Sequence, residues 1–414
     1  MKRSLFNVVI LGLSFFLVFT SFQTAGMIQN AVIDGINDEF SKQWNLKWSG
    51  YYSFCIIYAV LSIANWIAPS VVAAIGPRVS MILGALTYCI FVANFLYPMR
   101  YGLYIASVII GLGAGIIWTG QGNFLTLNST AETMTRNSGI FWAMLQCSLL
   151  FGNLFVFYQF QGKTKIEAST RMITYSVFLA VGVLGSLFLF ILRDRCRSEA
   201  ADDIIGPLTA LSLELAFFSV VYGTAIGRSL TLAKDPSKYI GISGMIIGAG
   251  EIIGGAFFGL LGSKTVKNGR DPIILFGFLV HISAFLITFL NLPPNSSLYE
   301  TDSPTYISSS IPLALCCSFL LGLGDSCFNT QIYSILGSVY AKESASAFAI
   351  FKFVQSIAAA IAFLYANSLN LHAQIFILSV TGAFGTLTFC LVEWIVFYEA
   401  VISVHSSSSS EPMN

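Results

Sequence analysis

The feature that most limits the fold of this chain is a succession of long apolar stretches separated by short polar ones. Each stretch holds about 20 mostly apolar residues, the length at which a helix crosses the hydrocarbon core of a bilayer. Backbone N–H and C=O groups find no hydrogen-bonding partner in lipid, so an all-α fold is expected. The sequence predicts twelve transmembrane helices, over residues 5–27, 50–74, 79–97, 102–126, 138–160, 172–192, 207–228, 239–262, 272–292, 311–335, 345–367 and 374–400.

The composition agrees with a polytopic membrane protein whose main partner is the lipid bilayer. Only 10% of the 414 residues are charged and 56% are hydrophobic, whereas a soluble domain carries about 25% charged residues. The net charge of +1 and the absence of basic or acidic blocks in the sequence give no reason to expect nucleic acid as a partner.

A weak internal repeat divides the spans into two sets of six. The segment Ile110–Thr126 resembles Leu320–Tyr340 at an offset of 211 residues (330 − 119), and such repeats are typical of duplicated transporter folds. We therefore expect two pseudo-symmetric six-helix bundles at 1–192 and 207–400. A charged cytoplasmic linker, 193–206, would join them, and a disordered, serine-rich cytoplasmic tail would occupy 401–414.

Charges near the ends of the spans predict the orientation. The densest basic group, Arg193, Arg195 and Arg197, is expected on the inner side. An even number of spans then places both termini in the cytoplasm. The sequon at Asn295 would face outward and could be glycosylated, unless it lies too near the membrane.

The basic start followed by Leu5–Phe22 could be a secretory signal, but the apolar run is long for one and is interpreted as the first span. Plasma membrane and endomembranes both remain open.

Ionisable side chains inside the spans need a partner or a function, because each costs roughly 3 kcal/mol in lipid. They are Glu214, Arg228, Glu251, His281, Asp325, Lys352 and Glu393. Asp325 and Lys352 lie about 15 Å and about 10 Å from the same end of consecutive spans. We expect them to form an ion pair, either a permanent brace or a switch that breaks when Asp325 takes up a proton.

Amide and indole side chains gather on the spans related by the repeat. We expect them to line a central cavity that contacts a solute; the alternative is that they only hydrogen-bond between helices, at about 0.6 kcal/mol each. The candidates are Gln23, Trp118, Gln121, Gln146, Asn329, Gln331 and Gln355, and Gln29 adds a further amide on the first span.

Glu251 is surrounded by glycines at four-residue spacing, which lets helices approach closely. It is either a proton site or a satisfied buried acid, and the sequence favours neither. The cysteines and histidines lack metal-binding spacing and the glycines lack the lysine of a phosphate-binding loop, so we expect no metal, no cofactor and no enzyme activity.

Twelve spans in two similar halves resemble the major facilitator superfamily. Its usual signature between the second and third spans contains an acidic residue, whereas this chain reads Gly76-Pro77-Arg78. Other segments resemble the uncoordinated-93-like branch, and within it the subgroup called major facilitator domain-containing protein eleven. They are Ala68–Arg78, Trp118–Gly122, Gly324–Gln331 and Ala347–Lys352. The resemblance implies the major facilitator fold, in a branch that includes an associate of a two-pore potassium channel and an escort of toll-like receptors.

Two functions remain open. The chain is either a secondary transporter that moves a small solute by alternating access, or a non-transporting accessory subunit of a channel or receptor. In the first, Asp325, Lys352 and Glu251 would couple transport to protons. In the second, the surfaces that face outward from the helices would matter more than the interior.

Overall fold

The structure, a computed structural model, describes residues 3–40, 43, 47–160, 166–193, 217–234, 236, 238–260 and 269–408. Ten helices in this part of the chain are long and apolar enough to cross a membrane, and the shorter apolar helices Pro77–Ala93 and Phe217–Gly227 take the third and seventh places. The predicted all-α architecture is therefore confirmed.

The N-terminal half contains six helices, and η1 (Leu189–Ile191) extends the last of them. These are α1 (Arg3–Phe40), α2 (Gly50–Ile75), α3 (Pro77–Ala93), α4 (Gly102–Leu127), α5 (Ala131–Phe160) and α6 (Ala168–Phe188).

The C-terminal half begins its described part with the π-helical turn η2 (Phe217–Val221), and η3 (Ala341–Glu343) precedes its fifth span. Its helices are α8 (Tyr222–Gly227), α9 (Lys238–Leu260), α11 (Asp271–Asn291), α12 (Ile311–Val339), α13 (Ser344–Ala366) and α14 (Leu371–Ser408).

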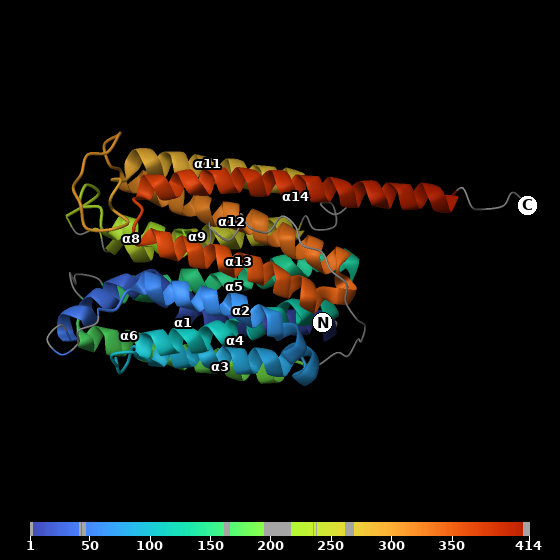
Figure 1. The fold of residues 1–414 in the computed structure, drawn as a ribbon, viewed down its shortest axis with the longest axis horizontal. Coiled ribbons are helices and arrows are strands. Elements are labelled where there is room, and N and C mark those ends of the chain that lie inside the picture. The colour runs from blue at the N-terminus through green and yellow to red at the C-terminus, as the bar shows by residue number, and fades with distance from the viewer. Residues whose placement is uncertain are drawn as a thin grey trace, which may run out of the picture.

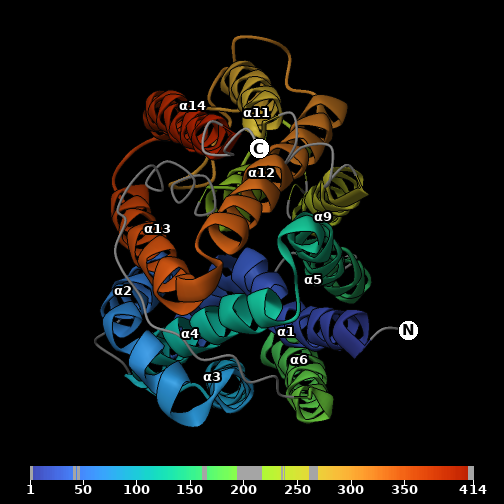
Figure 2. The same cartoon turned by 90° about the vertical axis from the view of Figure 1, so that its right-hand side faces the viewer.

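The two halves lie side by side, with their helices running along the long axis of the molecule (Figures 1 and 2). Across the interface α2 packs against α13, and α5 packs against α9. These are the second span against the eleventh and the fifth against the eighth, so the pairs exchange when the halves are swapped. This is the packing expected for two pseudo-symmetric bundles.

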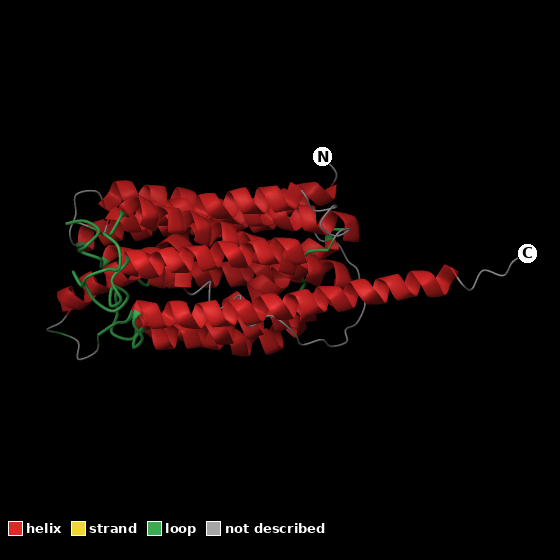
Figure 3. Ribbon diagram, turned by 90° about the horizontal axis from the view of Figure 1, so that it is seen from above, coloured by secondary structure: helices red, strands yellow, loops and turns green. Residues whose placement is uncertain are grey.

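Both chain ends lie at one end of the molecule, and α14 extends beyond it (Figures 1 and 3). We call this end the terminal face, and the end that carries the loop 292–310 the opposite face. Asn295 is half-buried in that loop, so it lies away from the termini. This relative arrangement is the one that the sequence predicts.

The two halves repeat a turn between their second and third spans. Gly76 has a φ of 80° between α2 and α3, and Gly269 has a φ of 89° just before α11. Glycine adopts this left-handed backbone without the clash that a Cβ would cause. Pro77 then opens α3 and Pro272 lies in the first turn of α11, where a missing N–H costs nothing.

Two predicted boundaries differ most from the structure. The first span was expected to end at residue 27, but α1 continues to Phe40. Its last turns remain helical because their acidic residues find partners, as Glu39 does in Arg171 at 2.7 Å. The tail was expected to be disordered from residue 401, yet α14 continues to Ser408. Residues 194–206 of the predicted linker, the start of the seventh span with Glu214, and residues 409–414 lie outside the described part.

Helix α9 is held between α5 and α12 by its glycines. A Cβ on Gly248 would lie 2.9 Å from that of Leu149 on α5, and a Cβ on Gly250 would meet the carbonyl oxygen of Phe319 on α12. From the other side, a Cβ on Gly322 of α12 would meet the carbonyl oxygen of Ile247 on α9. The α9 and α12 backbones therefore touch at the height of Glu251, as small residues allow.

This packing predicts that Gly322→Ala destabilises the protein. The added methyl group meets backbone atoms that cannot move alone, and overpacking of this kind costs about 1–3 kcal/mol. The control is Gly223→Ala, where the nearest atom is the flexible Met27 Cε at 3.4 Å. Thermal unfolding of the detergent-purified protein should show a lower midpoint only for Gly322→Ala, and equal midpoints would contradict the close approach.

Candidate functional site

A chain of polar side chains crosses the interface between the halves. Gln23 on α1 donates through Nε2 to Gln146 Oε1 on α5 at 3.3 Å. Gln146 lies within hydrogen-bonding reach of Glu251 on α9, and the indole Nε1 of Trp142, one helical turn before Gln146, donates to Glu251 Oε2 at 2.7 Å. The N-terminal half thus reaches the carboxyl group of Glu251 with two donors.

The chain continues from Glu251 to α12. The carboxyl groups of Glu251 and Asp325 lie within hydrogen-bonding reach of each other, and Asn329 Nδ2 donates to Asp325 Oδ2 at 2.7 Å. Glu251 is 0% exposed and Asp325 is 1% exposed. Two acidic side chains therefore meet in a buried place, halfway along α12.

Lys352 on α13 forms a second cluster nearby. Its ammonium donates to Gln355 Oε1 at 2.7 Å and lies 4.3 Å from the ring centroid of Trp118 on α4. The rings of Phe351 and Tyr333 lie 4.7 Å and 5.7 Å from the same ammonium. Aromatic faces attract a cation and partly replace its lost water.

The close contacts of Lys352 differ from the predicted ion pair. Asp325 acts on the ammonium as a nearby negative charge, while it accepts a hydrogen bond from Asn329 and lies within reach of Glu251. The ion pair between Asp325 and Lys352 stays a prediction, and the sequence analysis did not place Glu251 beside Asp325. Trp142 was missed, although it stands four residues before Gln146 and so shares its helix face.

Other predicted cavity residues are buried but only partly satisfied. Gln331 Nε2 donates to Thr330 at 3.1 Å, while its Oε1 and the Oδ1 of Asn329 hydrogen-bond to no other described residue. The same holds for both amide atoms of Gln121 and of Gln29. Unsatisfied buried polar atoms cost about 1–3 kcal/mol each, so these amide atoms need a polar partner, which water or a solute can supply.

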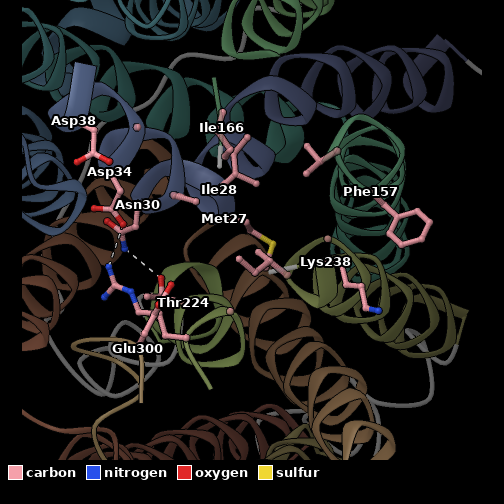
Figure 4. A pocket seen from close by; sticks show the side chains of 17 residues that line it. Met27, Ile28, Asn30, Asp34, Asp38, Phe157, Ile166, Thr224, Lys238 and Glu300 are labelled. Atoms are coloured by element: carbon pink, nitrogen blue, oxygen red, sulfur yellow. Dashed lines mark hydrogen bonds and ion pairs between the residues drawn. The ribbon is translucent and has the colours of Figure 1, made fainter. Parts of the chain in front are cut away.

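A cavity of about 210 Å³ opens at the opposite face, between α1 and α5 of one half and α8 and α9 of the other. Figure 4 shows Asp34 and Asn30 pointing from α1 toward the C-terminal half. Asp34 pairs with Arg228 at 3.5 Å, and Asn30 Nδ2 donates to Thr224 at 3.1 Å. Sequence reasoning placed Arg228 at a span end but found no partner for it.

A fixed ion pair stands apart from these groups, near the terminal face. Both carboxylate oxygens of Glu393 on α14 accept from Arg270 NH1, at 3.0 and 3.1 Å. Arg270 Nε also donates to Ser334, which is hydrogen-bonded to Thr135 of the N-terminal half at 2.7 Å. The side chains of the pair are only 5% and 7% exposed, so Glu393 has a structural partner.

His281 also has a structural place, as its lone position on an apolar helix predicts. Its ring stacks on Phe285 and Phe328, with centroids 5.9 and 5.6 Å away, and its Nε2 lies 3.2 Å from the carbonyl oxygen of Leu321.

Solved structures of similar architecture define the class of this protein. The proton:xylose symporter XylE, described as a major facilitator superfamily protein bound to 6-bromo-6-deoxy-D-glucose, superposes with a TM-score of 0.62 over 92% of this chain and 94% of its own. Only 13% of the aligned residues are identical, so the likeness concerns the fold alone. The chain is a multi-pass membrane protein with the major facilitator fold.

The sequence assigns it further. The family model "Ion channel regulatory protein UNC-93" matches residues 45–203 and 204–390. UNC93-like protein MFSD11 of Xenopus laevis is 42% identical, over 95% of this chain and 97% of its own. UNC93-like protein 3 of Arabidopsis thaliana is 26% identical, over 91% and 84%. The chain belongs to the UNC-93 family, which confirms the resemblance seen in its motifs.

The buried pair of Arg270 and Glu393 generates a stability prediction. Glu393→Gln leaves the guanidinium without its counter-charge and should cost about 3–5 kcal/mol. The double variant Arg270→Met with Glu393→Leu should recover most of that loss, because apolar residues can replace a whole buried pair. Thermal unfolding checks both, and a double variant no more stable than Glu393→Gln would refute this account.

Proposed function

We propose that this chain is a secondary transporter that carries a small solute across its membrane by alternating access of its two halves. The observation that carries the proposal is the polar chain from Gln23 to Asn329, which crosses the interface at the height of Glu251 and Asp325. An interface that stays closed is stabilised better by apolar contacts, whereas ionisable groups at membrane depth mark solute and ion pathways.

Alternating access requires contacts at both ends that can break in turn. At the opposite face the halves are joined by Asn30 with Thr224 and by Asp34 with Arg228. At the terminal face Thr135 meets Ser334, and Asn123 donates to Ser344 at 3.3 Å. Neutral hydrogen bonds contribute about 1 kcal/mol each and an exposed ion pair such as Asp34 with Arg228 contributes no more, so the free energy of a bound solute can exchange one set for the other.

The proposed site combines the groups of the interface. Gln121, Gln331 and Gln355 supply amides, and Trp118 supplies an aromatic face, for an uncharged or polar part of the solute. Lys352 supplies a positive charge, and the carboxyl groups of Glu251 and Asp325 couple solute transport to proton binding. The cavity at the opposite face would be the entrance through which the solute reaches this site.

Both termini face the cytoplasm in this proposal, which agrees with the basic cluster Arg193–Arg197. The loop 292–310 then faces outward or into a lumen, and Asn295 is available for glycosylation. Treatment with a glycosidase should lower the apparent mass of the wild type but not of Asn295→Gln. An unshifted wild type would argue against modification at this site.

The proposal predicts that Asp325→Asn folds but loses transport by about tenfold or more, because the carboxyl can no longer exchange a proton. The control is Asp302→Asn, an exposed acid in the loop at the opposite face. Metabolites are compared between cells that carry each form. Cells with Asp302→Asn should show the wild-type solute distribution, and cells with Asp325→Asn should show the distribution of cells that lack the protein. A normal distribution in Asp325→Asn would exclude the coupling role.

The alternative function is an accessory subunit of a channel or receptor. The observation in its favour is the family description, which names an ion channel regulator. Mild-detergent purification with quantitative mass spectrometry separates the two functions. A stoichiometric channel or receptor subunit supports the accessory function, whereas a protein that purifies alone and changes cellular metabolites through Asp325 supports transport.

A further inference from the structure

Glu251 and Asp325 form a carboxyl pair that nothing in the sequence predicted, since the sequence paired Asp325 with Lys352. We propose that the two carboxyl groups hold a single shared proton and that this pair is the proton-binding site of the protein. Its use in coupling rests on the proposed transport function, but the shared proton itself does not.

The first argument is the geometry of the pair. The α9 and α12 backbones touch at Gly250 and Gly322, so neither helix can withdraw its carboxyl group without repacking. Two carboxylates held together repel each other, whereas a hydrogen bond between them exists only if one carries a proton. The two carboxyl groups lie within reach of each other, and Trp142 and Asn329 donate to Glu251 Oε2 and Asp325 Oδ2, so one proton between the other two oxygens removes the repulsion.

The second argument is the set of donors around the pair. Trp142 Nε1 and Gln146 direct hydrogen bonds at Glu251, and Asn329 Nδ2 directs one at Asp325 Oδ2. Hydrogen bonds to a charged acceptor are the stronger kind. These donors stabilise the one negative charge that remains when the pair holds one proton. Each carboxyl group has its own donor, so the charge is stabilised on either side.

The third argument is the balance of charge. One proton leaves the pair with a charge of −1, which the ammonium of Lys352 on α13 balances. No proton would leave the buried cluster at −1 overall, and two protons would leave it at +1; both are costly in a dry interior. The singly protonated pair is the neutral state of this cluster.

Other titratable groups near the pair do not change that balance. Cys327 and Tyr333 on α12 are neutral in their ordinary states. His281 on α11 packs against the far side of α12, where its ring meets the position of Gly324. The donors on α5, Trp142 and Gln146, carry no charge. Arg270 and Glu393 neutralise each other near the terminal face.

The pair is also connected to the interface between the halves. Trp142 belongs to the N-terminal half and Glu251 to the C-terminal half, so their hydrogen bond spans the interface. A second proton on the pair would turn the acceptor of the Trp142 N–H from a shared negative charge into a neutral acid and weaken that bond. The protonation state thereby acts on the contact between α5 and α9.

Infrared spectroscopy of the purified full-length protein tests the shared proton directly. At neutral pH the wild type should show a carbonyl-stretch band of a protonated carboxyl group that shifts when D₂O replaces H₂O. Glu251→Gln and Asp325→Asn should each abolish the whole band, because an amide in the pair donates to the remaining carboxylate and removes the need for a proton. Asp302→Asn, in the exposed loop at the opposite face, should leave the band unchanged.

Several results would overturn the proposal. They are the absence of the band in the wild type, its loss in only one of the two variants, and a loss of half of it in each, which indicates two independent protonated acids. If a variant of the pair fails to fold, Trp142→Phe keeps both acids and should shift the band without removing it; an unshifted band would contradict the proposal. A band that behaves as expected in a protein with no metabolite phenotype would refute transport while leaving the shared proton in place.

Discussion

Charge carried into the membrane must be neutralised there, and this protein does so in two different ways. Arg270 and Glu393 form a bidentate ion pair whose charges are fixed, because guanidinium does not release its proton. Lys352 lies near Asp325, which meets a second acid, Glu251, so in our proposal the charge balance of Lys352 depends on how many protons the two acids hold. The first arrangement suits a brace near the terminal face. In our proposal the second arrangement can change its charge, and it lies where the two halves meet.

The adjustable site exists because glycines let three helices come together. Glu251 projects from α9, whose glycines bring its backbone against that of α12 on one side and against Leu149 and Asn153 of α5 on the other. Larger residues on α9 would separate the helices by several ångströms and take Trp142 and Asp325 out of hydrogen-bonding reach of Glu251. The glycine spacing seen in the sequence therefore does more than pack the bundle. It determines which polar groups can meet and from which half of the protein they come.

The spans and the identities of the buried polar residues could be predicted from the sequence, since hydropathy and the high cost of charge in lipid are local properties. Their pairing could not. Glu251 and Asp325 are 74 residues apart (325 − 251), and their meeting depends on the rotation of two helices about their axes. A shift of one residue along a helix turns a side chain by about 100° around the helix axis. The hydrophobic periodicity of the sequence does not fix the rotation of two distant helices this closely. Arg270 was missed for a related reason: it was assigned to a loop by hydropathy, yet its side chain turns inward to α14.

The interior also bears on the choice between carrier and accessory subunit. A scaffold that only docks to a channel gains nothing from a lysine and two acids buried between its halves, because apolar residues of similar volume give equal or greater stability. Retaining them is understandable if the interface opens and the charges meet water or a solute for part of a cycle. The channel-regulator description of the family is compatible with such a cycle, since a carrier that changes shape with protonation can transmit that change to a bound partner.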